Sequence, residues 1–216
     1  MNDKLLLSFG KQPRCFDFVK NGNLSDLFYD FSVCQILNSG LIKLKNPIPA
    51  EQLHQKYEWI RNKEPNDHAD IVAEEIIQNI KKNSKVLFLS NFDKIPYNLT
   101  KNIIGTQAML LDPSDDLNIF EKTPDQALIQ NQIKKETTER LSAKYGQFEI
   151  ITTCRLLEHT ESIPIFVEAL NKMLKPGGKI IVEVPDSTKS LLQGDIAMLW
   201  EEHIHYFTPE SLRSEF

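Results

Sequence analysis

Short apolar runs alternate with helical stretches along the second half of the chain. Four such runs occupy residues 85–90, 108–114, 148–154 and 179–185. Short aliphatic runs bounded by turn residues are typical of strands that are buried on both faces of a parallel sheet. Because helical stretches lie between them, the pattern predicts an α/β fold built on a doubly wound, mostly parallel sheet.

Helical periodicity is clearest just before the first of these runs. Residues 66–83 begin with Asn66 as a helix cap and carry acids in the first turn and lysines at the end, as the helix dipole favours. A second amphipathic helix is predicted over residues 161–178, which end in a proline and a glycine pair. The stripe of the first helix expected to face the core consists of Ile71, Ala73, Ile76, Ile77 and Ile80.

Two other stretches are less regular. A helix is predicted to begin at about Pro49, after prolines that stop an extended segment. Residues 117–143 are ambiguous, because their pattern agrees both with a strand near residues 117–120 and with a polar helix over residues 126–146.

The first 48 residues differ from the rest of the chain. They are rich in aromatic side chains and turn formers and show no sustained helical period, which predicts short strands and loops. We therefore expect a small N-terminal lobe over residues 1–48 and a core domain over residues 49–216.

Composition narrows the possible partners. The chain has 216 residues, 41% of them apolar, and a formal charge of −5 with both signs interspersed. This balance favours neither nucleic acid nor an anionic membrane surface as a partner. No apolar run is long enough to span a bilayer, and the N-terminus lacks the apolar core of a signal peptide, so we expect a cytoplasmic protein. The three cysteines argue against a secreted disulfide framework.

Ligands of open parallel sheets bind at the carboxyl ends of the strands, so candidate chemistry is expected there. Asp112 follows the second predicted strand, about 20 positions beyond the first strand-to-helix turn, where a carboxylate can accept from both ribose hydroxyls of a nucleoside. Because Asp-Pro-Ser also favours turn initiation, Asp112 is equally compatible with a purely structural turn.

The first strand-to-helix turn lacks glycine. No glycine occurs between Gly40 and Gly105, which excludes a standard pyrophosphate-binding loop and argues against a nicotinamide or flavin enzyme. A ligand without phosphates stays compatible with the turn. Asn91 and Asp93 can accept positive φ, and the carboxylate of Asp93 could meet an ammonium group.

Two later stretches carry a family resemblance. The segments "FEIITTCRLLEH" and "FVEALNKMLKPGGKIIVEVPD" resemble the region around the fourth and fifth strands of class I S-adenosylmethionine-dependent methyltransferases. Together with "WEEHIHYFTPESL", they look most like the sugar C-methyltransferase group. The resemblance implies a Rossmann-like fold, S-adenosyl-L-methionine as cofactor, a small zinc-binding N-terminal lobe and methyl transfer to a carbon of a sugar-like or other small polar substrate.

The resemblance also implies roles for individual residues. C-methylation requires a base to remove a proton next to a keto group, and the family pattern gives this role to His203, with Glu202 beside it and Tyr206 as a possible hydroxyl contact. His205 is expected to be solvated. The cofactor is expected to lie at strand ends marked by Ser90, Asn91, Asp93, Asp112, Leu156 and His159.

Departures from the family pattern open an alternative. Cys15 and Cys34 each stand without the second cysteine of a zinc knuckle, so we expect no metal. The glycine-free turn, together with Trp200 and Glu201 in place of the family's tyrosine and histidine, favours a non-catalytic methyltransferase-like binding module or an inactive fragment as the alternative.

The last predicted helix begins in the expected way, with Thr208 as cap and Pro209 in the first turn. The fold that the chain resembles continues through this helix into two further strands. The resemblance therefore predicts that the sequence is truncated at its C-terminus.

Overall fold

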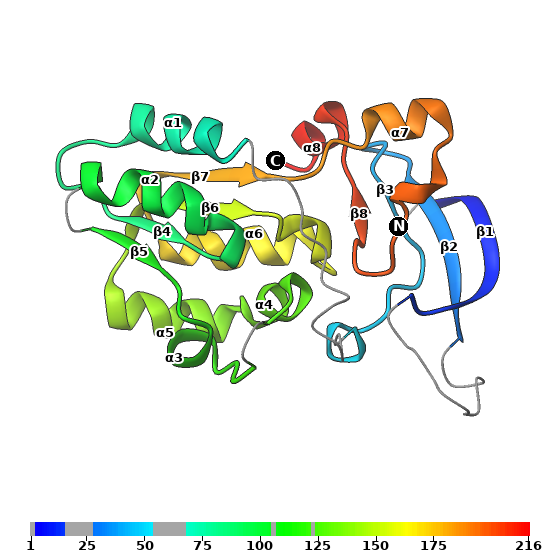
Figure 1. Ribbon diagram of the computed structural model, residues 1–216, viewed down its shortest axis with the longest axis horizontal. Coiled ribbons are helices and arrows are strands. Elements are labelled where there is room, and N and C mark those ends of the chain that lie inside the picture. Colours follow the sequence, from blue (N-terminus) through cyan, green and yellow to red (C-terminus); the bar gives the residue numbers. More distant parts are fainter. Residues whose placement is uncertain (1–2, 16–27, 54–67, 105–106, 122–123) are drawn as a thin grey trace. The chain divides into compact units, whose positions relative to one another are not determined.

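The computed structural model describes residues 3–15, 28–53, 68–104, 107–121 and 124–216. The chain divides into two compact units (Figure 1). The first comprises residues 1–63 and 185–216, and the second comprises residues 64–184. The expected lobe at 1–48 and core at 49–216 stay a prediction, since compact units need not follow such boundaries.

The second unit is built on a parallel sheet. Its four strands stand in the order β5 (Ala108–Leu110), β4 (Val86–Phe88), β6 (Phe148–Cys154) and β7 (Leu174–Glu183). All three strand pairings are parallel. Each of the four predicted strands is therefore present, and the Rossmann-like α/β fold is confirmed.

Helices connect these strands. Figure 1 shows α1 above the sheet and α5 below it. Helix α1 packs against α2, and α5 packs against α6, as expected for a sheet wound on both faces. The helical elements of this unit are α1 (Ala69–Asn79), the 3-10 helix η4 (Asn91–Asp93), α2 (Lys94–Ile104), α3 (Pro113–Leu117), α4 (Gln126–Gln132), α5 (Lys135–Tyr145), the 3-10 helix η5 (Leu157–His159) and α6 (Ile163–Met173).

One hydrophobic cluster of the second unit lies between α1 and the sheet. Val72 and Ile76 of α1 pack against strand residues such as Val86 and Phe88. The predicted stripe of α1 is partly wrong, because Ile71 is 65% exposed and Ile77 is 38% exposed. The buried residues instead are Ala69, Val72, Ala73 and Ile76, which follow strict helical spacing. The predicted cap Asn66 lies outside the described residues.

Glycines determine where α6 gives way to β7. The helix predicted to reach residue 178 ends at Met173, and β7 already begins at Leu174. Gly177 has a φ of +75°, and a Cβ added to Gly178 would lie 2.9 Å from the carbonyl oxygen of Lys175. The glycine pair is therefore required for the bend inside the strand rather than for a helix end.

In residues 117–143, which the sequence pattern left ambiguous, the regular secondary structure is helical. No strand forms near residues 117–120, since α3 ends at Leu117 and Asn118 takes a left-handed conformation with φ 57°. The polar helix predicted over residues 126–146 is divided into α4 and α5.

The first unit contains an antiparallel sheet drawn from both ends of the sequence. Its order is β1 (Asp3–Pro13), β2 (Phe28–Ile36), β3 (Ile42–Leu44) and β8 (His205–Tyr206). The short strands predicted in the first 48 residues are thus present, and β8 adds a strand from the C-terminal segment by pairing with β3. The remaining elements are the 3-10 helix η2 (Ala50–Gln52), α7 (Thr188–Gln193), the 3-10 helix η6 (Ile196–Met198) and α8 (Pro209–Ser214).

The two helix starts predicted in this unit have different outcomes. The start of α8 is confirmed, because Thr208 Oγ1 accepts a hydrogen bond of 3.2 Å from the amide of Ser211. After Pro49 the structure contains η2, and the continuation of that predicted helix beyond Leu53 lies outside the described part of the chain.

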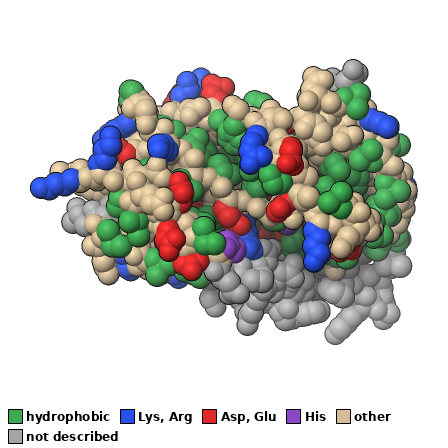
Figure 2. Space-filling view, turned by 90° about the horizontal axis from the view of Figure 1, so that it is seen from above, with side chains coloured by type: hydrophobic (Ala, Val, Ile, Leu, Met, Phe, Trp, Pro, Cys, Tyr) green, Lys and Arg blue, Asp and Glu red, His purple; other side chains and the backbone are tan. Residues whose placement is uncertain are grey.

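The surface agrees with the even charge balance of the sequence. On the face seen in Figure 2, lysine and arginine side chains are interspersed with aspartate and glutamate. Among the described residues, no helix is both long enough and apolar enough to cross a membrane.

Candidate functional site

The carboxyl ends of β4, β5, β6 and β7 meet at one edge of the parallel sheet, where the candidate cofactor residues of the second unit lie. Ser90 follows β4 and is buried. Its hydroxyl donates to the carbonyl oxygen of Cys154 at 3.1 Å and accepts from the amide of Phe92 at 3.2 Å. Ser90 therefore joins the ends of β4 and β6 and caps the turn between β4 and α2.

Asp93 closes this turn from inside. Its side chain is fully buried, and Oδ2 accepts from the amides of Leu89 at 3.2 Å and Ser90 at 2.9 Å. Burial raises the pKa of the carboxyl group above its usual value, against the opposing effect of its hydrogen bonds. The predicted contact between Asp93 and an ammonium group therefore requires a different conformation of this turn.

An open cavity of about 630 Å³ lies beside the ends of β4 and β5. Two of the predicted cofactor residues, Asn91 and Asp112, line it together. Volumes of this size are typical of small-molecule sites. The other lining residues combine polar and apolar side chains: Lys94, Pro113, Ser114, Ile119, Phe120, Glu121 and Pro124.

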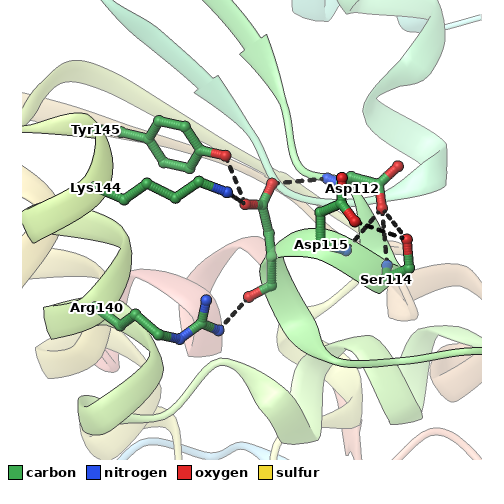
Figure 3. Close-up of polar contacts among 7 residues, drawn as sticks. Asp112, Ser114, Asp115, Arg140, Lys144 and Tyr145 are labelled. Atoms are coloured by element: carbon green, nitrogen blue, oxygen red, sulfur yellow. Dashed lines mark hydrogen bonds and ion pairs between the residues drawn. The ribbon is translucent and has the colours of Figure 1, made fainter.

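Asp112 caps α3 while it lines this cavity. Its Oδ1 accepts from the Ser114 hydroxyl at 2.6 Å, the Ser114 amide at 2.9 Å and the Asp115 amide at 3.0 Å. These bonds, the one from the Ser114 hydroxyl foremost, lower the pKa of Asp112, so the group is an anion at neutral pH. Among the residues drawn in Figure 3, no dashed contact reaches its second oxygen.

Asp116 holds the same turn from its buried side. Its Oδ2 accepts from the amide of Asp112 at 3.0 Å, and its Oδ1 accepts from Lys144 Nζ at 2.9 Å and from the Tyr145 hydroxyl at 2.6 Å (Figure 3). The guanidinium of Arg140 donates to its carbonyl oxygen. The acidic turn after β5 is therefore attached to α5 by side chains that the sequence pattern did not single out.

The ends of β6 and β7 are occupied by protein side chains. Glu183 lies 3.6 Å from Arg155 Nε and 3.3 Å from His68 Nε2, measured from its two carboxylate oxygens. The guanidinium of Arg155 also stacks over the ring of Phe92, 4.9 Å from its centroid. The cavity that remains among these side chains is only about 10 Å³. No ligand larger than a single water fits there.

Arg155 adopts a left-handed conformation with φ 53°, which is uncommon for a non-glycine residue. Sequence reasoning missed it together with His68 and Glu183. The one feature of the sequence that could have pointed to Arg155 is its position directly after a buried strand.

The two predicted positions after β6, Leu156 and His159, are buried, and so is Glu158 between them. Leu156, Glu158 and His159 are 0%, 1% and 6% exposed. Desolvation raises the pKa of Glu158 to about 8, with a further contribution from Glu183 and an opposing one from Arg155. At neutral pH this carboxyl group is therefore mostly protonated.

The predicted catalytic residues belong to the first unit. Glu202 is buried, and the ring of His203 lies 5.2 Å from that of Trp200. The amide of His203 donates to the carbonyl oxygen of Trp200 at 3.2 Å, which closes a tight turn. The catalytic role of Glu202 and His203 stays a prediction.

Tyr206 has a structural role in this turn. Its buried hydroxyl accepts from the amide of Trp200 and donates to the carbonyl oxygen of Trp200, both at 2.9 Å. A substrate contact through this hydroxyl stays a prediction, and it would compete with these two bonds.

The expectation that His205 is solvated is wrong. His205 lies in β8 opposite Lys43 of β3 and is 6% exposed. Desolvation lowers the pKa of its imidazole to about 4, with a smaller contribution from Lys43. The imidazole is therefore neutral at physiological pH.

The two lone cysteines take different places in the first unit. Cys15 is exposed at the surface, and its Sγ accepts from the indole Nε1 of Trp200 at 3.2 Å. Partial desolvation, followed by the hydrogen bond with Glu201, raises the pKa of its thiol to about 12. Cys34 is buried in β2. That this unit binds no metal stays a prediction.

Comparison with known proteins relates the chain to methyltransferases. Residues 93–216 match a family model described as a methyltransferase domain. A segment of 76 residues is 32% identical to the ubiquinone biosynthesis O-methyltransferase of Chelativorans sp. (strain BNC1). This segment covers 35% of the chain and 29% of that relative, so the match spans less than a third of the curated protein.

Proposed function

The chain belongs to the methyltransferase domain family, and from that premise we propose that it transfers a methyl group from S-adenosyl-L-methionine to a small molecule. The observation that carries the proposal is the open cavity beside the ends of β4 and β5, with the anionic carboxylate of Asp112 in its wall. The volume and the mixed lining of this cavity suit the adenosine portion of the cofactor.

The donor set at this cavity fits that portion. The outer oxygen of Asp112 can accept from the two ribose hydroxyls, since its other oxygen is already used in capping α3. Ile119, Phe120 and Pro124 offer apolar surface for the base. Lys94 also lines this cavity, and its ammonium group has the charge that would attract the carboxylate of the methionine portion.

When bound, the cofactor supplies an electrophilic methyl group. On the protein side, the acceptor must lose a proton as it is methylated, and we assign this proton to His203 as general base, with Glu202 beside it. The acceptor class follows the sequence resemblance, which favours a carbon of a sugar-like or other small polar substrate. A hydroxyl acceptor is the alternative, because the curated relative is an O-methyltransferase.

One observation favours a second candidate function. The side chains of Arg155, Phe92 and Glu183 fill the ends of β4, β6 and β7 and leave only about 10 Å³. A module that binds an adenosine compound without transferring a methyl group would need only the cavity beside the ends of β4 and β5. It would need no space for an acceptor at the ends of β6 and β7. This non-catalytic binding module is the alternative to the enzyme.

Both candidate functions require binding of the cofactor, which isothermal titration with S-adenosylhomocysteine tests. Binding heat from folded protein, reduced in Asp112→Asn, is the expected result. Absence of heat at millimolar ligand, with the protein shown to be folded by circular dichroism, overturns both.

Methyl transfer from labelled S-adenosylmethionine to a panel of sugars and phenols then separates the two candidates. Turnover that is lost in His203→Ala, while affinity for S-adenosylhomocysteine is retained, supports the enzyme. Binding without turnover over the whole panel supports the module.

A further inference from the structure

The acidic turn after β5 is connected to α5 through one buried carboxylate, that of Asp116. Its two oxygens accept three hydrogen bonds, from the amide of Asp112, from Lys144 and from Tyr145 (Figure 3). Asp116 is 3% exposed, whereas Asp112 lies at the surface. The turn therefore has an inner carboxylate bonded to protein and an outer carboxylate that faces the cavity.

The inner carboxylate is well enough paired to remain charged. Burial by itself would raise the pKa of Asp116, but the bonds from Tyr145, the Asp112 amide and Lys144 together hold it below its usual value. Moving the carboxylate of Asp116 away from its three donors would leave a buried charge unpaired, which is energetically costly. The carboxylate therefore holds the turn after β5 firmly against α5.

The connection acts on the atoms that determine where Asp112 points. The amide of Asp112 is fixed by Asp116 from the side of α5, and its Oδ1 is fixed by the first amides of α3 from the other side. With main chain and side chain both held, the outer oxygen keeps one direction relative to the cavity. Such preorganisation improves binding because the group need not be ordered when the ligand arrives.

We propose that Asp116 is a positioning residue for Asp112, and that it sets the affinity of the cavity for the ribose of an adenosine ligand without touching that ligand. This inference rests on the proposed function, since it concerns the same cavity. On this view, the contact between α5 and the turn after β5 contributes to recognition of the ribose as well as to stability.

A double-mutant cycle separates positioning from stability. Asp116→Asn keeps the volume of the side chain but places an amide group against at least one of the donors that the carboxylate accepts from. The variant is prepared alone and in an Asp112→Ala background, and affinity for S-adenosylhomocysteine is measured by isothermal titration. We expect roughly 10-fold weaker binding in the single variant, the equivalent of one charged hydrogen bond, and no further loss in the Asp112→Ala background.

Two more variants keep the test interpretable. Asp115→Asn is the matched control, because its carboxylate faces Ser114 at 3.4 Å and makes no contact with α5 among the described residues. Its affinity is expected to match that of the wild type. Tyr145→Phe removes a single donor from Asp116 and is the milder variant should Asp116→Asn fail to fold. Its expected loss of affinity is about 3-fold.

Hydrogen exchange supplies a readout that needs no ligand. The amide of Asp112 should exchange faster in Asp116→Asn than in the wild type, while amides in the middle of β4 keep their protection. Unchanged exchange at Asp112 overturns the inference, and so does an affinity loss of equal size with and without the Asp112 side chain. If the wild type binds no S-adenosylhomocysteine although the Asp112 amide responds as expected, the proposed function has failed and the role in recognition fails with it.

Discussion

Acidic residues follow three neighbouring strands of the parallel sheet, yet they have different surroundings. Asp93 after β4 and Glu158 after β6 are buried, whereas Asp112 after β5 lies at the open cavity. The difference begins in the backbone. A 3-10 turn brings Asp93 back under the amides at the end of β4, while Pro113 starts a helix directly and leaves Asp112 at its exposed N-terminus.

The comparison shows that the position of an acid at a strand end does not determine its charge. Burial raises the pKa of both Asp93 and Glu158, but hydrogen bonds from the start of α3 lower the pKa of Asp112. Of these three acids, Asp112 is the one that is both exposed and, through its lowered pKa, ionised at neutral pH. The variants below test this contrast, from the largest expected effect to the smallest.

Glu158→Gln should stabilise the protein at alkaline pH. The pKa of Glu158 is raised from 4.5 to about 8, so the folded state binds this proton more tightly than the unfolded state. Stability therefore falls as pH rises from 4.5 to about 8 and stays reduced above that range. Relative to the wild type, the variant should gain roughly 5 kcal/mol at pH 9 and almost nothing at pH 4, measured by urea unfolding. A gain of the same size at both pH values would contradict an acid that is protonated by burial.

Asp93→Ala should destabilise the protein at all pH values. It leaves the amides of Leu89 and Ser90 without the acceptor that they share, which should cost about 3 kcal/mol in urea unfolding. Asp93→Asn keeps an acceptor oxygen in place and is expected to lose less than half as much. Equal stability of Asp93→Ala and the wild type would mean that this carboxylate does not support the turn.

Asp112→Asn should affect binding but not folding. Asparagine caps a helix as well as aspartate does, so stability should change by less than about 0.5 kcal/mol, while affinity for S-adenosylhomocysteine falls roughly 10-fold. Asp195→Asn is the matched control, because Asp195 caps η6 in the first unit through a bond of 2.9 Å to the amide of Ala197. Equal affinity in the two variants would remove Asp112 from the binding site.

Ser114→Ala is expected to have the smallest effect. The Ser114 hydroxyl makes the shortest bond to Asp112, 2.6 Å, and is the leading cause of its lowered pKa. Without it the pKa of Asp112 should move up toward its ordinary value, which an NMR pH titration of the carboxyl carbon measures. Affinity at neutral pH should fall only about 2-fold, because Asp112 stays ionised there. A 10-fold loss would instead indicate that Ser114 itself contacts the ligand.

Local chemistry made several features predictable. The aliphatic runs around Val86 and Ile151 could be assigned to parallel strands because both faces of such strands are covered. Thr208 could be recognised as a helix cap and Asp112 as the start of a turn, since both depend on side chains within a few positions of one another.

Other features depend on residues that are distant in sequence. His205 was expected to be solvated, and its burial results from the pairing of β8 with β3, where it stands opposite Lys43. Asp116 has no unusual local pattern, and its partners Lys144 and Tyr145 lie 28 and 29 positions away. The contacts of Glu183 with His68 and Arg155 likewise join the ends of different strands and helices.

By itself, the amino-acid sequence determined which segments form the parallel sheet and which acids stand at its carboxyl edge, because hydrophobic periodicity and turn chemistry act over a few residues. Only the tertiary structure decided which of those acids faces solvent and which lies under backbone amides. That choice depends on how the chain leaves each strand and on what packs against it, and the dielectric surroundings that result set the charge of each carboxyl group.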